Sequence, residues 1–126
     1  MTTTESKATQ LVRDYYASWQ DGIASFDEPR LRDILAPDML FEGPIAGTRT
    51  GVDSFMGGLR AFVQSMRGLR MIQLVESADG GAALYDCDLG SSSGTLRFAE
   101  FLGVAHGRIT SIRLVYDPAE FRRLVS

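Results

Sequence analysis

The chain has 126 residues, of which 44% are hydrophobic and 23% are charged, and these fractions are typical of one globular domain. Its net charge of −3 gives no global support for binding a nucleic-acid backbone. No apolar run approaches the ~18 residues of a membrane-spanning helix, and the first residues lack the apolar core of a signal peptide. Cys87 is the only cysteine, so no intrachain disulfide can form, and a cytoplasmic location is expected.

Two helices are predicted before any strand. Residues 1–6 are predicted to be a disordered tail, and apolar side chains then recur at helical spacing over about residues 7–20. The segment Asp27–Pro29 marks the start of a short second helix, because an acidic cap is followed by Pro in the first turn. Pro37 ends that helix, since Pro disfavours a helical conformation in the residue before it.

A short apolar strand, Met39–Glu42, is predicted next, and it runs into a carboxylate and a Gly-Pro turn. A Gly-rich loop over residues 47–51 leads to a third helix from Val52, whose apolar positions fit the helical period closely. The pair Gly57–Gly58 inside this helix costs roughly 1 kcal/mol per Gly relative to Ala. We therefore expect a close backbone contact on that face of the helix.

The second half of the chain predicts an antiparallel meander, because Gly-containing turns separate long apolar runs. The expected strands cover residues 69–77, 82–89, 95–105 and 108–116. The segment Asp117–Glu120 opens a last short helix, with Asp as the cap, Pro at the first position and Glu completing a capping-box-like set. Residues 7–126 thus predict a single α+β domain in which helices pack on one face of a curved sheet.

Several stretches carry a resemblance to a known family. They are Leu35–Pro44, the Arg49–Gly51 entry to the long helix, His106–Ile109 before the last strand, and Tyr116–Phe121. With this order of elements, the chain resembles the NTF2-like (SnoaL-like) superfamily over roughly residues 7–125. The resemblance implies a cystatin-like cone, in which three helices from the N-terminal half pack on a curved mixed or antiparallel sheet and a short C-terminal helix follows. It also implies a deep apolar cavity, usually in a homodimer.

The superfamily includes ketosteroid isomerases, polyketide cyclases and limonene-epoxide hydrolases, and one cone hosts many chemistries as well as non-enzymes. By resemblance, Glu42 falls where ketosteroid isomerases carry their general-base Asp, and Tyr15 falls near their oxyanion-hole Tyr. Arg97 stands where their protonated Asp is expected, which departs from the pattern. Compared with limonene-epoxide hydrolases, Asp88 matches an acid but Asp86 replaces an Arg. No known specificity can therefore be transferred.

Alternation along the strands divides the side chains between two faces, and the family pattern selects the face of Leu84, Arg97 and Ile112 as the cavity face. The candidate catalytic residues are then Glu42, Arg97, Asp86, Asp88 and Tyr15. The candidate substrate-binding residues are Leu40, Trp19, Phe55, Leu84, Ala99, Phe101, Ile112, Leu114 and Tyr116.

Charge balance constrains this predicted cavity. Three acids would share one Arg, so at least one carboxyl should have a raised pKa, which a general acid or base at neutral pH requires. The alternative is a structural Arg97–Asp86 bridge with Asp88 in solvent, and Glu42 is open to a structural interpretation too.

The remaining chemically distinctive side chains favour ordinary structural roles. His106 is the only histidine and lies in a predicted tight turn, so it is expected at the surface. With one His and one Cys, no metal-ligand spacing exists, and neither a metal nor a cofactor is expected. Cys87 is interpreted as a small apolar residue that faces away from the cavity.

Two functions remain open from the sequence. The first is a cofactor-independent enzyme that performs acid–base chemistry on a small hydrophobic carbonyl or epoxide compound, as an isomerase, cyclase, dehydratase or hydrolase. The second is a non-catalytic module that binds a small ligand or a protein. An apolar outward set, Leu96, Phe98, Leu102 and Val115, predicts a homodimer through the outer sheet face. Neither nucleic acid nor a membrane is expected as a partner.

Overall fold

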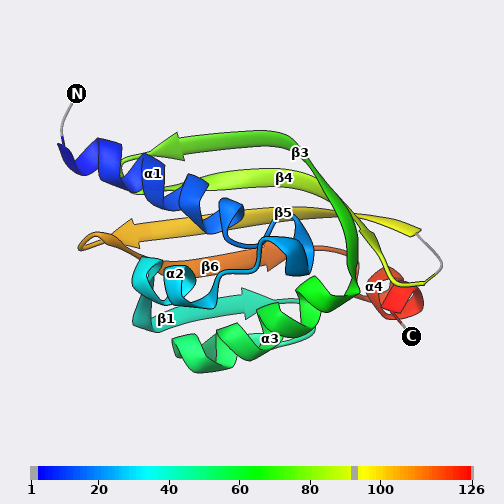
Figure 1. Ribbon diagram of the computed structural model, residues 1–126. Helices are drawn as coiled ribbons and strands as arrows, with labels where there is room; N and C mark the ends of the chain where they lie inside the picture. Colours follow the sequence, from blue (N-terminus) through cyan, green and yellow to red (C-terminus); the bar gives the residue numbers. More distant parts are fainter. Residues whose placement is uncertain (1–2, 92–93, 126) are drawn as a thin grey trace.

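The computed structural model describes residues 3–91 and 94–125 and has the α+β architecture that the sequence predicts. Helices α1 (Thr3–Ala17), α2 (Glu28–Ile34) and α3 (Val52–Ser65) belong to the first half, and α4 (Pro118–Val125) follows the sheet. A 3-10 turn, η1 (Gly22–Ala24), lies between α1 and α2. The strands are β1 (Leu35–Gly43), β2 (Gly47–Thr50), β3 (Met66–Ser77), β4 (Gly80–Leu89), β5 (Gly94–Ala105) and β6 (Arg108–Val115) (Figure 1).

Two predicted helix caps are confirmed by hydrogen bonds. The backbone N–H of Arg30 donates to Asp27 Oδ1 at 3.1 Å, at the start of α2. The backbone N–H groups of Ala119 and Glu120 donate to Asp117 Oδ1 at 3.0 and 3.3 Å, at the start of α4. Each cap satisfies N–H groups that have no partner inside the helix, and this explains why both helices begin where the sequence places them.

Boundaries without such a signal are less well predicted. The helix expected over about residues 7–20 spans Thr3–Ala17, and residues 1–2 of the predicted tail lie outside the described residues. Strand β1 begins at Leu35, directly after α2, because the Ala36–Pro37 step is already extended. No helix in the described part of the chain has the length and apolar composition needed to cross a membrane.

The sheet has the strand order β2-β1-β6-β5-β4-β3. Strands β3 to β6 form the predicted antiparallel meander. Residues 47–50, expected to be a loop, instead form β2, which pairs with β1 so that Arg49 lies opposite Phe41. Strand β1 also pairs in parallel with β6, with Phe41 beside Ile112, so the first strand lies next to the last. The sheet is therefore mixed.

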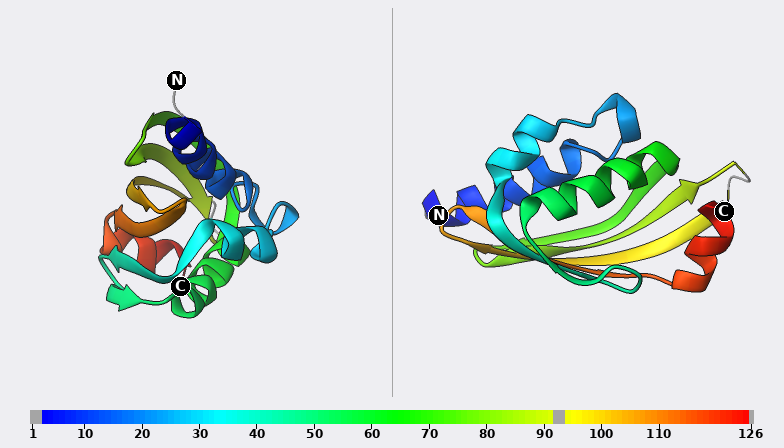
Figure 2. Two further views of the ribbon diagram at one scale, coloured as in Figure 1. Left: turned by 90° about the vertical axis from the view of Figure 1, so that its left-hand side faces the viewer. Right: turned by 90° about the horizontal axis from the view of Figure 1, so that it is seen from below.

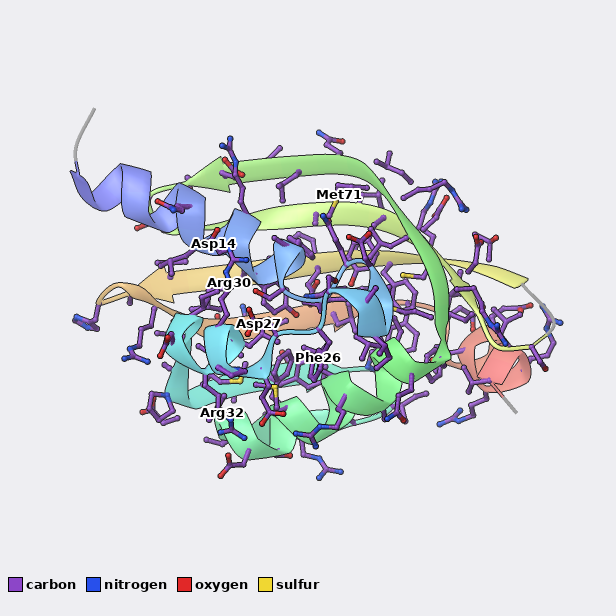
Figure 3. All side chains as sticks on the ribbon, in the orientation of Figure 1. Asp14, Phe26, Asp27, Arg30, Arg32 and Met71 are labelled. Carbon is purple, nitrogen blue, oxygen red and sulfur yellow. The ribbon has the colours of Figure 1, made fainter. Side chains whose placement is uncertain are left out.

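Helices α1, α2 and α3 lie on one face of the curved sheet, and α4 lies at one end of it (Figure 2). Helices α1 and α2 are joined by an ion pair between Arg30 Nη2 and Asp14 Oδ1 at 2.7 Å, and both residues are labelled in Figure 3. The core fills the space between the helices and the sheet, where Val12, Leu31 and Met56 have no exposed surface.

The predicted faces of β4 and β5 are wrong. The side chains buried toward the helices are Ala83, Tyr85, Cys87 and Leu89 in β4, and Leu96, Phe98, Glu100 and Leu102 in β5. The prediction placed the alternate set inward and Cys87 outward. The structure buries one carboxyl on this face, whereas the predicted arrangement would bury two aspartates and an arginine, each at a desolvation cost of several kcal/mol.

The same correction applies to the predicted dimer surface. Leu96, Phe98 and Leu102, expected to face outward, belong to the core, while Val115 is 56% exposed as expected. Phe101, expected in the cavity, is 50% exposed on the outer face. The homodimer stays a prediction, and the outer apolar surface that would support it contains Phe101 and Val115.

The Gly57–Gly58 pair does not make the expected close contact. A Cβ atom at either position would have no neighbouring atom within 4 Å. Gly58 instead lines a cavity, and Gly57 is exposed.

Candidate active site

A pocket of about 700 Å³ lies between the helices and the sheet, and its wall is mainly apolar, with many aromatic side chains. The end of α1, the turn after it, α3 and four strands supply the inner wall. These residues include Tyr15, Trp19, Phe55, Gly58, Leu59, Phe62, Phe41, Tyr85, Phe98, Glu100 and Leu114. The β1–β2 turn, β2 and α4 supply side chains nearer to solvent, including Ile45, Arg49, Phe121 and Val125. A pocket of this size and composition suits a small apolar ligand.

Glu100 is the carboxyl in the wall of this pocket, and it is only 2% exposed. The hydroxyls of Tyr16 and Tyr85 donate to its Oε1 atom at 2.8 and 3.1 Å. The hydroxyl of Tyr15 donates to Oε2 at 3.2 Å. No ion pair joins Glu100 to a cation among the side chains that the structure describes, which are those of residues 10–91 and 94–125. Three phenols from α1 and β4 therefore hold a buried carboxyl without a counter-charge.

This environment brings the titration of Glu100 close to neutral pH. Burial raises the pKa of Glu100 to about 7, although the hydrogen bonds from Tyr16, Tyr85 and Tyr15 act in the opposite direction. Burial, and next the negative charge of Glu100, raise the pKa of all three tyrosines. The phenols therefore stay neutral donors while Glu100 gains and loses a proton. One cavity carboxyl does have a raised pKa, as expected, but it is not one of the predicted acids.

Glu42 does not line the pocket. It belongs to the outer face of β1, where its Oε2 atom lies 3.2 Å from Arg113 Nε, and its side chain is 44% exposed. The two residues are neighbours in the parallel β1–β6 pair. Phe41, the residue before it, points inward and contacts Phe55 with ring centroids 5.4 Å apart. The predicted cavity position of Glu42 is wrong. Side chains alternate between the two faces of β1, and Phe41 rather than Glu42 is on the face toward the cavity.

Asp86, Asp88 and Arg97 also lie outside the pocket, on the outer face of the sheet. Arg97 Nε and Nη2 donate to the two carboxylate oxygens of Asp86 at 2.8 and 3.1 Å. Asp88 accepts hydrogen bonds from Arg70 at 3.0 Å and from Thr95 at 2.6 Å. These hydrogen bonds lower the pKa of both aspartates. The structural Arg97–Asp86 bridge, the alternative left open by the sequence, is confirmed.

The predicted substrate-binding residues divide in the same way. Trp19, Phe55, Leu114 and Tyr116 line the pocket, as does Tyr15 from the predicted catalytic set. Ile112 is buried in the core but is not part of the lining. Leu40, Leu84, Ala99 and Phe101 do not line it either, because they share the face of Glu42, Asp86 and Arg97.

The sequence did not predict the cluster formed by Glu100, Tyr16 and Tyr85. A signal for Glu100 was present in the sequence, because it is the one charged residue in the apolar alternate set Leu96, Phe98, Glu100 and Leu102. An ionisable residue at a core position of a strand is a candidate for function. The three tyrosines had no such signal, since two come from a helix about 85 residues away along the chain.

The pocket offers no metal site by its composition. Among the described side chains, those of residues 10–91 and 94–125, no group of three or more His, Cys, Asp or Glu residues converges so as to hold a metal ion. Trp19 packs edge-on against Tyr15 and Tyr85, with ring centroids 5.8 and 6.0 Å apart. The buried polar groups of the wall are thus one carboxyl, phenol hydroxyls and an indole N–H.

The sequence profile of the SnoaL-like domain matches residues 12–112. The chain belongs to the SnoaL-like family. This family is part of the NTF2-like superfamily, as the resemblance of the sequence indicated. No curated protein matches the chain significantly.

Solved structures similar to this SnoaL-like protein share its fold at low sequence identity. A protein from Kribbella flavida DSM 17836 is 23% identical, with 94% of this chain and 93% of that chain covered and a TM-score of 0.82. A proposed SnoaL-like polyketide cyclase from Jannaschia sp. CCS1 is 9% identical, with 100% and 96% covered and a TM-score of 0.80. A proposed ketosteroid isomerase from Kribbella flavida DSM 17836 is 20% identical, with 91% and 81% covered and a TM-score of 0.74. At these identities the similarity shows the fold alone.

Proposed function

We propose that this SnoaL-like protein is a cofactor-independent enzyme that moves a proton on a small apolar carbonyl compound, with Glu100 as the general base. The observation that supports the proposal is the buried carboxyl, with a pKa of about 7, in the wall of an apolar pocket of about 700 Å³. Near neutral pH both of its protonation states are populated, so the same group can accept a proton from one carbon and return it to another.

The hydrogen bonds favour one oxygen as the proton acceptor. Oε1 of Glu100 already accepts two phenol hydrogens, while Oε2 accepts only the longer bond from Tyr15. Oε2 therefore has more lone-pair capacity left for a substrate proton. Once Oε2 is protonated, it can donate to the Tyr15 oxygen, and the hydrogen of Tyr15 is then released toward the substrate. Tyr15 would thus stabilise the charge that develops on the carbonyl oxygen, the role expected from the sequence.

A single titrating carboxyl suits proton transfer between carbons better than hydration of an epoxide. Opening an epoxide with water calls for a base on the water and an acid on the departing oxygen. The three phenols that surround Glu100 are poor acids, because burial and the charge of Glu100 raise their pKa. Isomerisation of an enone or an aldol-type cyclisation needs only one base, with neutral donors on the oxygen. We therefore favour an isomerase or cyclase over a hydrolase.

The test is exchange of the protons next to a ketone. 2-Tetralone, a two-ring ketone with acidic α-protons, is incubated with the protein in D₂O, and loss of its α-proton signals is followed by NMR. We expect exchange above the buffer rate in the wild type and in Glu42→Gln, and exchange reduced at least about a hundredfold in Glu100→Gln, the range of general-base effects. Equal exchange in both variants would refute the assignment of Glu100.

A second function, ligand binding without catalysis, is favoured by the strongly apolar wall and by the exposed position of Glu42. In that case the phenol–carboxylate cluster would only hold α1 against the sheet. The same experiment separates the two functions, because a pure binding protein would bind the ketone and leave its α-protons at the buffer exchange rate.

A further inference from the structure

Trp19 carries a polar group that the proposed function leaves without a role. The residue is 1% exposed, it lines the pocket, and its Nε1 atom is buried with no hydrogen-bond partner among the described residues. Buried donors without a partner destabilise folded proteins and are few in native structures. In a pocket wall, an acceptor atom on a bound ligand can satisfy such a donor.

The other buried donors of the wall are already used. Tyr15 and Tyr85 each donate a hydroxyl hydrogen to Glu100. A hydroxyl has a single hydrogen to donate, so neither can bind a ligand oxygen while Glu100 is ionised and ready to accept a proton. Trp19 is thus the buried donor of the described wall that is available before the reaction begins.

The indole N–H lies on the side of the pocket where Glu100 and Tyr15 are. A weak side-chain hydrogen-bond contact from Trp19 lowers the pKa of Tyr15, against the larger effects of burial and of Glu100, and so the indole N–H lies near that hydroxyl. It nevertheless makes no hydrogen bond of normal geometry there. Because Tyr15 in turn contacts Glu100 Oε2, a ligand oxygen on Trp19 Nε1 would bring its neighbouring carbon toward the proposed base.

We propose that Trp19 Nε1–H binds the acceptor oxygen of the ligand, so that the pocket selects apolar ring ketones over hydrocarbons of the same shape. The inference rests on the proposed function, since it assigns the donor for the carbonyl whose α-carbon Glu100 deprotonates. Removal of that proton moves negative charge onto the oxygen, and the N–H then makes a charge-assisted bond that is stronger than its bond to the ketone. Trp19 would therefore contribute to rate as well as to binding.

The wild-type protein allows a direct test, because Trp19 is its only tryptophan and its indole N–H signal needs no assignment. The signal is followed by ¹H–¹⁵N NMR during titration with 2-tetralone and with tetralin, the hydrocarbon of nearly the same shape. We expect a downfield movement of the indole proton with the ketone and none with tetralin. Equal movement with both ligands would overturn the proposal.

The variant Trp19→Phe gives an independent measurement, and the matched ligand corrects for the smaller ring. We expect Trp19→Phe to weaken binding of 2-tetralone about tenfold more than binding of tetralin, the size expected for one hydrogen bond. Parallel losses for the two ligands would overturn the proposal. α-Proton exchange without a ketone-specific indole shift would keep the proposed function and reject this inference. A ketone-specific indole shift without α-proton exchange would keep this inference and reject the proposed function.

Discussion

Replacing Glu100 with Gln should change how the stability of the protein depends on pH. The folded state holds the Glu100 proton up to a pH of about 7, whereas the ordinary value for the unfolded chain is 4.5. Between these values the folded protein binds a proton that the unfolded chain has lost, so the free energy of unfolding falls as pH rises. Gln has nearly the same shape and cannot ionise, and this pH dependence should therefore disappear in Glu100→Gln.

The magnitude follows from the two pKa values. A change from 4.5 to about 7 corresponds to about 3 kcal/mol, because one pKa unit is 1.36 kcal/mol. Glu100 is fully buried, so solvent screening does not reduce this figure greatly. We expect wild type and Glu100→Gln to be similarly stable at pH 5. At pH 8 the variant should be more stable by up to about 3 kcal/mol, or roughly 10 °C in Tm for a domain of this size.

Urea unfolding at several values between pH 5 and pH 8 would measure this difference. Comparison of two proteins that differ only at position 100 cancels every other titrating group. Glu42→Gln is the matched control, since it is the same substitution at an exposed carboxyl paired with Arg113. That pair should contribute at most about 1 kcal/mol to the free energy of unfolding. Parallel pH profiles for wild type and Glu100→Gln would refute the reasoning.

Three further predictions concern the rest of the molecule. Gly57→Ala and Gly58→Ala should each stabilise α3 by about 1 kcal/mol in urea melts, since an added Cβ meets no atom within 4 Å, and a loss at either position would contradict this. Asp117→Ala should lower stability by about 1 kcal/mol through loss of the α4 cap, and an unchanged Tm would show that the cap is unimportant. Finally, we propose a homodimer through the outer sheet face, and sedimentation at micromolar concentration should show a dimer in wild type and a monomer in Phe101→Asp. A monomeric wild type would contradict that proposal.

The order of elements could be predicted because local chemistry determines it. Caps at Asp27 and Asp117 mark helix starts, and Gly-containing turns separate the strands of the meander. The parallel pairing of β1 with β6 could not be predicted in this way. It joins residues about 70 positions apart, and nothing near Phe41 or Ile112 in sequence specifies the partner. Strand β2 was missed because it is only four residues long and fully exposed, and because the glycines at its start and just after its end, Gly47 and Gly51, suggest a turn.

The site was only partly predictable, because alternation gives two sets of side chains without saying which set faces the helices. The family pattern selected the set with Asp86, Asp88 and Arg97, whereas the apolar character of Tyr85 and Phe98 favours the other set. If the inward face had been chosen only by the cost of burying charged groups, the correct side chains of β4 and β5 would have been predicted to face the helices. Glu100 would then have been the acid predicted inside the protein. Tyr15 and Trp19 were placed correctly, since both fall on the apolar side of the helical spacing predicted over about residues 7–20.

The parallel contact between β1 and β6 has a consequence for how the molecule assembles. Residues 40–42 can pair on that side of β1 only after residues 111–113 of β6 have been synthesised. This contact therefore closes one of the longest loops in the chain. Contacts of such sequence separation slow folding, since the entropy of loop closure is lost before any stabilisation is gained. During synthesis, β1 and the β1–β2 hairpin therefore have an unpaired edge until β6 has left the ribosome. We expect the meander to form first and the pocket to be completed last, as a late kinetic step.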